Sequence, residues 1–271
     1  MPELPEAETI ARTLAAAGAG AIIRQVRLLR RDFLKTGSQA RLRQLAGVKI
    51  VAVTRRGKCV ILEAPPWRVV LQLGMAGRVY VHESGRPPPP HTHLVISLAD
   101  ERQIRYANSR RIAAGVHLLA GGQAGPLAGM GLDADRISRN DFITRLAGRT
   151  APIKAALLNQ SILAGVGNIY ADEALFRAGI RPTRRIRRIS RAELAKLHRA
   201  VRAVLAEAID AGGSTVSVST PFADANGQLG RFTICHRVYG RYGQRCRRCR
   251  VVLRRTTVAG RTTTYCPRCQ R

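Results

Sequence analysis

Residues 157–182 read LLNQSILAGVGNIYADEALFRAGIRP, and they set the fold class of the middle of the chain. Apolar residues recur at helical spacing on both sides of a Gly-x-Gly step at 165–167, which predicts a helix, a turn and a second helix. The turn directs backbone N–H groups toward the start of the second helix, where an anion is favoured. The stretch therefore predicts either a phosphate site, with Asn168 as a further donor, or an ordinary helical pair whose glycines only cap.

The chain before this stretch has the pattern of a β-rich domain. Residues 3–17 predict a helix, because Pro5 suits a first turn and the glutamates complement the positive end of the helix dipole. Short runs rich in Val and Ile then follow between residues 21 and 107, divided by Gly, Pro and charges as in a sandwich or barrel. The stretch RPPPPHTH at 86–93 predicts an exposed loop.

The chain after this stretch is first helical and then strongly basic. Helical spacing, which starts near Asp141, continues through RAELAKLHRAVRAVLAEAIDAG, and the last part, 231–271, holds twelve arginines and no acid. Overall, 46 basic residues face 17 acidic ones, for a formal net charge of +29. Such an excess indicates a polyanionic partner, of which nucleic acid is the commonest and an anionic membrane surface the alternative.

Nothing in the sequence predicts a membrane span or export. No apolar run approaches the roughly 18 residues that a spanning helix needs. Acidic residues stand near the N-terminus, where a secretory signal would carry basic ones. We therefore expect a cytoplasmic protein.

Four of the six cysteines form two pairs near the end of the chain, Cys246 with Cys249 and Cys266 with Cys269. Two C-x-x-C pairs at this separation are typical of zinc knuckles that close one tetrahedral site. Four thiolates leave no open position, so the predicted Zn²⁺ is structural. A pair of redox dithiols is the alternative, but the residues between the pairs predict a β-hairpin turning at Ala259-Gly260, which favours zinc.

Two positions carry reactive amines. Initiator methionine is normally removed before proline, so Pro2 would become a secondary amine at the new terminus, although many chains begin this way without chemical reason. Terminal amines titrate at roughly 7.7–8.0, which leaves a neutral fraction near neutral pH. Lys58, one of only five lysines, lies between two predicted strands. It is a candidate for proton transfer or phosphate contact, or else a solvated lysine at a strand end.

Taken together, these segments resemble the formamidopyrimidine-DNA glycosylase / endonuclease VIII family. The matching segments run in the family's order along the whole chain. They are MPELPEAE at the start, RRGK at 55–58, LGMAG at 73–77, SRR at 109–111, GVGNIYADEALF at 165–176, VYGR at 238–241 and GRTTTYCPRCQ at 260–270. Met75 and the arginine pair favour the formamidopyrimidine-DNA glycosylase branch.

The resemblance implies an α+β multidomain fold. An N-terminal catalytic β-sandwich domain flanked by helices would span 1–131, a helix–two-turn–helix domain 136–222, and a zinc-bound β-hairpin finger 232–271. It implies a base-excision enzyme that flips out an oxidised purine such as 8-oxoguanine or a formamidopyrimidine, removes it, and nicks the strand by β,δ-elimination. The implied partner is double-stranded DNA with an oxidised base or an abasic site. A monomer is expected, associated with the nucleoid and not with a membrane.

The resemblance also assigns roles to individual residues. Pro2 would attack the sugar C1′ and form a Schiff base, and Glu3 would be the general acid and base. Lys58 would contact phosphate and assist β-elimination, while Arg261 would grip the flipped phosphate and assist δ-elimination. The remaining assignments are two supporting acids and five DNA-contacting positions: Glu6 and Glu173; His91, Arg110, Asn168, Met75 and Ile112.

Three segments depart from the family pattern. The usual Asp-Pro-Arg-Arg-Phe-Gly stands here as NSRRIA at 108–113, so the wedge that fills the gap left by the flipped base is Ile112. Losing an aromatic ring forfeits stacking of about 1–3 kcal/mol per base, so we expect weaker lesion search or altered opposite-base preference. The lid segment, 219–232, also differs, which leaves the lesion ranking open. The family has a basic residue shortly before the segment PIK (152–154), whereas this chain has Thr150 there, with Arg149 beside it.

Two other functions remain open at this point. Preference for oxidised pyrimidines is the alternative within the family, and Met75 argues against it. A non-catalytic DNA-binding zinc protein on the same scaffold would explain the charge, the finger and the helical hairpin. It would not explain why Pro2, Glu3 and Lys58 occur together in their matched places.

Overall fold

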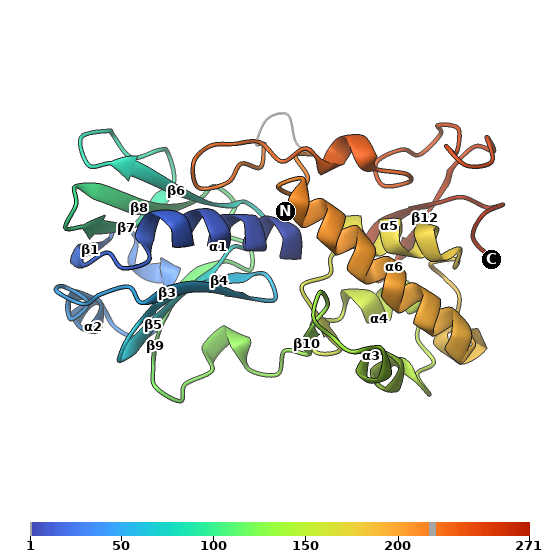
Figure 1. Ribbon diagram of the computed structural model, residues 1–271, viewed down its shortest axis with the longest axis horizontal. Helices are drawn as coiled ribbons and strands as arrows, with labels where there is room; N and C mark the ends of the chain where they lie inside the picture. Colours follow the sequence, from blue (N-terminus) through green and yellow to red (C-terminus); the bar gives the residue numbers. More distant parts are fainter. Residues whose placement is uncertain (1, 217–220) are drawn as a thin grey trace. The chain divides into compact units, whose positions relative to one another are not determined.

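The computed structural model describes residues 2–216 and 221–271, and it forms two compact units (Figure 1). Unit 1 comprises Met1–Ala128 and Ala211–Arg231, and unit 2 comprises Gly129–Asp210 and Phe232–Arg271. The chain therefore passes between the units three times. The division into three domains expected from the sequence stays a prediction.

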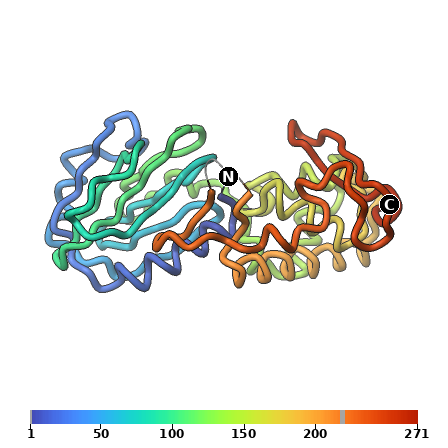
Figure 2. Tube along the Cα trace, turned by 90° about the horizontal axis from the view of Figure 1, so that it is seen from above, coloured from blue at the N-terminus to red at the C-terminus, as the bar shows by residue number. Residues whose placement is uncertain are grey.

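Unit 1 is built on two sheets, which can be followed along the chain trace in Figure 2. The first is antiparallel, in the order β1 (Ile23–Leu28), β7 (Thr92–Leu98), β8 (Arg102–Asn108), β6 (Gly77–Glu83). The second has the order β2 (Leu34–Thr36), β9 (Gly115–Ala120), β5 (Trp67–Gln72), β4 (Cys59–Ala64), β3 (Ala52–Arg56). Only the β2–β9 pair of the second sheet is parallel.

One apolar core lies in unit 1, built by both sheets and by α1 (Leu4–Gly18). Ala7, Ile10 and Leu14 recur on one face of α1 and are fully buried, and the helix packs against β3 and β4. Every residue of β7 is buried, which explains its continuous apolar sequence. The predicted helix and the predicted sandwich are confirmed.

Several elements of unit 1 have no counterpart in the sequence analysis. They are α2 (Gln39–Arg43), the short strand β2, the interior strand β9, and two 3₁₀ turns at Arg31–Phe33 and Gly125–Leu127. The exposed loop predicted at 86–93 is shorter than expected, because Thr92 and His93 already belong to β7 and are buried.

Unit 2 holds four helices and two small sheets. The helices are α3 (Arg139–Leu146), α4 (Ile153–Leu158), α5 (Asn168–Ala178) and α6 (Arg191–Asp210), with 3₁₀ turns at Ile186–Arg188 and Phe232–Cys235. β10 (Leu132–Asp133) and β11 (Leu163–Ala164) pair in parallel, and β12 (Arg254–Val258) and β13 (Arg261–Tyr265) form a hairpin. The predicted helix–turn–helix is α4 and α5, with Gly165 at φ 97° between them.

The hairpin turns where the sequence predicts. Ala259 and Gly260, the two residues between β12 and β13, have φ values of 49° and 68°. Two successive positive φ values characterise the type I′ turn, whose twist matches that of the flanking strands. Figure 2 shows the hairpin, in dark red, standing out from the helices of unit 2.

Candidate active site

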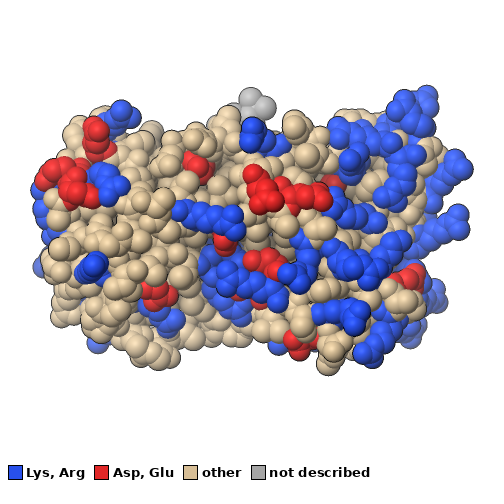
Figure 3. Space-filling model, in the orientation of Figure 1, with Lys and Arg blue, Asp and Glu red and all other residues tan. Residues whose placement is uncertain are grey.

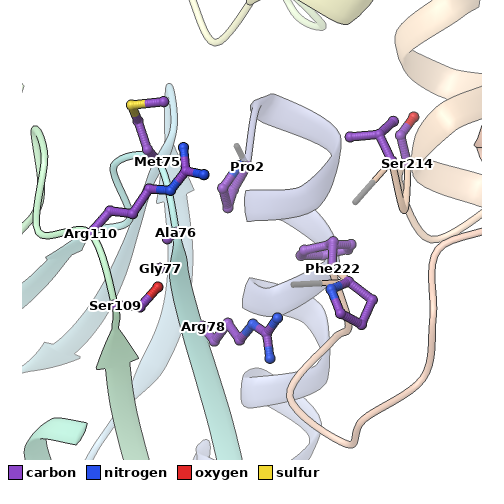
Figure 4. A pocket seen from close by; sticks show the side chains of 11 residues that line it. Pro2, Met75, Ala76, Gly77, Arg78, Ser109, Arg110, Ser214 and Phe222 are labelled. Atoms are coloured by element: carbon purple, nitrogen blue, oxygen red, sulfur yellow. The ribbon is translucent and has the colours of Figure 1, made fainter. Parts of the chain in front are cut away.

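A pocket of about 140 Å³ lies in unit 1 beside the start of α1 (Figure 4). Pro2 lies in its wall, together with Met75 from the β5–β6 loop and Arg110 from the β8–β9 loop. Pro221 and Phe222, from the described part of the lid segment, complete another side, whereas residues 219 and 220 lie outside the described residues. Three residues that the sequence analysis selected separately thus meet in one cavity.

A buried carboxylate fixes the backbone around this pocket. The Glu6 Oε2 atom accepts the N–H of Glu3 at 2.8 Å, and its Oε1 atom accepts the N–H of Ser214 at 2.7 Å. Position 213 needs glycine, because its φ is 85° and a Cβ there would lie 2.9 Å from Glu6 Oε1. Glu3 itself is the N-cap residue of α1 and is buried. Glu6 therefore ties the residue after Pro2 to the segment that lines the pocket.

The turn that carries Lys58 is tied to α1 by an ion pair. Lys58 is half-buried between β3 and β4. The Arg55 guanidinium donates to the Gly57 carbonyl at 3.1 Å and to Glu8 Oε2 at 2.9 Å, and its side chain is only 1% exposed. Burial opposes ionisation of Glu8, but hydrogen bonds from Arg55 and Arg12 outweigh it and lower the pKa of this carboxyl. Sequence analysis missed this pair.

Two loops with predicted wedge residues touch through their backbones. The Met75 N–H donates to the Ile112 carbonyl at 3.3 Å. Gly74 has φ 57°, and a Cβ there would lie 2.3 Å from the same carbonyl oxygen, so only glycine fits. The Ile112 side chain is 56% exposed, as a residue that enters a base step must be.

Asn108 shapes the loop that carries Arg110. Its Oδ1 accepts the N–H groups of Arg110 and Arg111 at 3.1 and 2.7 Å, and its Nδ2 donates to the Leu73 carbonyl at 3.0 Å. Its own N–H donates to the carbonyl of His91, which is exposed and has φ 62°. An aspartate could accept the first two bonds but could not donate the third. Asparagine therefore preserves the loop at this departure from the family pattern and joins it to the Met75 loop.

In unit 2 the structure brings Asn168 and the hairpin together. Asn168 Nδ2 donates to the Thr262 carbonyl at 3.0 Å, and Thr262 follows Arg261, which is exposed at the start of β13. Arg185 donates to the Thr150 carbonyl at 3.2 Å. The Arg185 guanidinium thus lies beside position 150, where the family has a basic residue and this chain has threonine.

A buried ion pair, which sequence analysis missed, supports the same hairpin. Lys154 Nζ lies 2.7 Å from Asp172 Oδ1 and 2.7 Å from Thr263 Oγ1, and the lysine and aspartate side chains are at most 1% exposed. Asp172 Oδ2 accepts the N–H of Thr264 at 3.0 Å. Burial raises the pKa of Asp172 to about 7, against the attraction of Lys154 and the Thr264 bond. A rare lysine inside the apolar run IKAALL was the signal that could have indicated a buried partner.

Glu173, predicted as a supporting acid, holds a turn of backbone in unit 2. Its carboxylate accepts the N–H groups of Arg237, Val238 and Tyr239 at 2.8–2.9 Å. Burial raises the pKa of this carboxyl, although the three N–H bonds lower it. Glu173 thereby anchors the VYGR segment to α5.

The four predicted ligands meet in one cluster. Their Sγ atoms all lie within 4.8 Å of one another, with Cys246 and Cys269 at 4.0 Å and Cys249 and Cys266 at 3.4 Å. A tetrahedral zinc with Zn–S bonds of about 2.3 Å separates its sulfurs by about 3.8 Å, which these distances bracket. The chain therefore has one structural zinc site, formed by Cys246, Cys249, Cys266 and Cys269.

The predicted site residues fall into two sets, one in each unit. Pro2, Glu3, Glu6, Lys58, Met75, His91, Arg110 and Ile112 belong to unit 1, and Asn168, Glu173, Arg261 and the cysteines to unit 2. On the face shown in Figure 3, Lys and Arg side chains gather most densely over unit 2. Among the described residues, no helix has the length and apolarity to cross a membrane.

Comparisons with known proteins cover nearly the whole chain. Three family models match: the formamidopyrimidine-DNA glycosylase N-terminal domain at 1–114, its H2TH domain at 129–220, and the zinc finger found in FPG and IleRS at 243–271. The formamidopyrimidine-DNA glycosylase of Bacillus subtilis is 36% identical over all of this chain and 99% of its own length. That of Symbiobacterium thermophilum is 40% identical over all of this chain and 89% of its own.

Solved structures agree with these sequences. Lactococcus lactis Fpg in complex with DNA containing an abasic site matches at a TM-score of 0.90 and 31% identity, over 99% of both chains. A mutant of the same enzyme with DNA containing Fapy-dG matches at 0.91 and 31%, over 100% of both chains. With sequence relatives and solved structures aligned over its full length, the chain belongs to the formamidopyrimidine-DNA glycosylase family.

Proposed function

We propose that this protein is a DNA glycosylase and abasic-site lyase of base excision repair that removes oxidised purines from double-stranded DNA. Its relatives are named formamidopyrimidine-DNA glycosylases, and its structural neighbours hold DNA with an abasic site or Fapy-dG. The observation that carries the proposal is the position of Pro2 in a pocket walled by Met75 and Arg110. Met75 supports the preference for purines over oxidised pyrimidines.

In the proposed reaction Pro2 is the nucleophile. Its secondary amine attacks C1′ of the damaged nucleotide, the N–C1′ bond forms, and the glycosidic bond breaks as the base leaves with a proton. In this proposal Glu3, which is buried and follows Pro2 in the chain, supplies or takes up that proton. The proton lost by the amine then goes to O4′ as the C1′–O4′ bond breaks and the sugar ring opens, which leaves an iminium ion between the Pro2 nitrogen and C1′. This cation accepts the electron pair released when a C2′ proton is removed. The 3′ C–O bond then breaks by β-elimination.

Lys58, Asn168 and Arg261 handle phosphate in this proposal. Lys58 lies on the turn that Arg55 ties to Glu8 of α1, the helix that begins just after Pro2 and Glu3. Arg261 stands exposed at the hairpin tip, where its guanidinium can grip a phosphate and assist the δ-elimination that breaks the 5′ C–O bond. Zinc holds that hairpin in shape and takes no part in the chemistry. Such an enzyme would work as a monomer at the nucleoid.

Borohydride trapping tests the proposal. The protein is incubated with a duplex carrying one 8-oxoguanine opposite cytosine, then reduced, and its intact mass is measured. Removal of Met1, which lies outside the described residues, is read from the same spectrum. We expect a covalent DNA adduct at Pro2 and its loss in the variant Pro2→Gly, with DNA binding retained. Full excision by that variant would refute the assignment of Pro2.

Two further outcomes separate the alternatives. An adduct with the abasic duplex but not with the 8-oxoguanine duplex would support lyase activity and indicate that the enzyme removes a different damaged base. No adduct on either duplex, with Met1 shown to be absent, would leave a non-catalytic DNA-binding zinc protein.

A further inference from the structure

An arginine that neither the motifs nor the proposed reaction uses points into the same pocket. Arg78 lies on β6, and its half-buried side chain lines the pocket with Pro2 and Phe222. Figure 4 shows its guanidinium reaching from the strand toward α1. It is thus a cation in a cavity that also has apolar side chains, such as Met75 and Phe222, in its walls.

One half of this guanidinium lacks a partner. Arg78 Nη1 donates to the Tyr80 hydroxyl at 3.3 Å, whereas Nη2 is buried and has no hydrogen-bond acceptor among the described residues. The described residues that line the pocket include a second arginine, Arg110, and no acid. Buried donors in native proteins are nearly always paired, and this one belongs to a charged group. An acceptor that enters the pocket would complete it.

We propose that Arg78 reads the base that occupies this pocket, by donating from Nη2 to a carbonyl oxygen on the ring; this rests on the proposed function. Apolar walls such as Met75 and Phe222 suit the faces of a planar base, and a single polar group then fixes its orientation. A guanidinium offers donors only. The pocket would therefore favour a lesion with an acceptor at the edge that Arg78 meets.

This chemistry separates guanine-derived from adenine-derived lesions. Guanine carries an O6 acceptor where adenine carries an N6 amino donor. An amino group facing Arg78 would leave the Nη2 donor unpaired and bring two donors together. We therefore expect 8-oxoguanine to be excised faster than the formamidopyrimidine of adenine, and Arg78 to account for much of that difference.

The test compares single-turnover rates on three duplexes, which carry 8-oxoguanine, the adenine-derived formamidopyrimidine or an abasic site. The variants are Arg78→Met, which removes the hydrogen-bond donors, and Arg78→Lys, which keeps the positive charge but loses the two Nη groups of the guanidinium. The control is Arg27→Met, which removes a cation from the exposed side of β1. Thermal melting confirms that each variant is folded.

We expect Arg78→Met to lower the ratio of 8-oxoguanine excision to abasic-site nicking by about 10-fold or more, with a smaller fall for the adenine lesion. Arg78→Lys should lie between, and Arg27→Met should leave the ratio unchanged. An unchanged ratio in Arg78→Met, or an equal fall on all three duplexes, would overturn the inference. Wild-type protein that nicks no abasic duplex would instead refute the proposed function.

Discussion

The sandwich of unit 1 and the zinc finger of unit 2 hold their functional residues by different physical means. The sandwich encloses 26 buried apolar residues in one cluster. The cluster at the finger has only five; one of them, Phe176, comes from α5, and two are the ligands Cys246 and Cys266. So small a segment cannot bury enough apolar surface to fold by that means alone. The comparison teaches that a metal and buried polar groups replace the apolar core where a thin, exposed hairpin has to be rigid.

Removing zinc should have the largest effect, because it should unfold the finger and leave the sandwich folded. Structural zinc in small fingers contributes an apparent binding free energy of about 10–16 kcal/mol at pH 7, so its loss should unfold the hairpin and leave the sandwich intact. Hydrogen exchange should show β12 and β13 losing protection while β7 and β8 keep theirs, and DNA affinity should collapse. Cys249→Ser should reproduce this, and Cys235→Ser, outside the cluster, should not. A protected hairpin in metal-free protein would contradict the account.

The buried ion pair of unit 2 gives the next largest effect. Lys154→Met leaves the Asp172 carboxylate buried without its partner, which should cost about 3–5 kcal/mol of unfolding free energy. Urea denaturation measures this loss. Replacing both residues, as Lys154→Met with Asp172→Leu, should restore most of the stability. A double variant no better than the single one would show that the pair itself, rather than the stranded charge, stabilises the hairpin.

The Glu8–Arg55 pair tests the corresponding support in unit 1. Glu8→Gln should cost about 1 kcal/mol, reduced by solvent at the partly exposed carboxylate, and should slow nicking because the Lys58 turn loosens. The matched control is Glu207→Gln, which breaks an exposed pair with Arg177 and should cost less.

The pH dependence of Glu8→Gln has a definite sign. The folded pKa of Glu8 lies below its ordinary value of 4.5, so the unfolded chain binds more protons between the two values. The stabilisation is present above about pH 4.5 and is lost as pH falls through the lowered folded value. The difference in melting temperature between wild type and Glu8→Gln should therefore vanish in acid. A difference that grew as pH fell would rule out this assignment.

Ile112→Phe gives the smallest expected change, and it is a gain. An aromatic wedge should strengthen binding to a lesion duplex by about 1 kcal/mol through stacking. Stability should stay the same, because the side chain is 56% exposed and packs against little. Binding titration and a melting curve check both points, and weaker binding by Ile112→Phe would show that the loop is built for isoleucine.

Local patterns predicted most of the elements, because periodicity and turn chemistry act within a few residues. The hairpin turn at Ala259-Gly260 and the zinc cluster were both predicted from the residues of that segment alone. Strand β9 was missed, since the apolar run at 116–119 does not alternate and continues into a Gly-rich segment. That strand lies between β2 and β5 in its sheet, so the missing prediction concerned an interior strand rather than an edge.

Contacts between distant residues could not be predicted from one sequence. Glu8 and Arg55 are 47 positions apart, and Asn108 meets Leu73 across 35. No local spacing signals such pairs, because they arise only when strands and helices pack. The resemblance to a family supplied the roles of Pro2, Glu3 and Lys58 and pointed to Glu6 as a support. The pairing of Arg55 with Glu8 became visible only in the folded chain.

The bond from Ser214 to Glu6 spans 208 positions, and it determines when the pocket can form during synthesis. Unit 1 needs Ala211–Arg231, which leave the ribosome only after the helices of unit 2. A nascent chain therefore carries Pro2 from the outset but lacks the wall made by Ser214 and Phe222 until most of the protein exists. An interrupted translation product would be unable to seat a nucleotide against its amine. The order of the chain thereby delays completion of the pocket until most of the protein has been made.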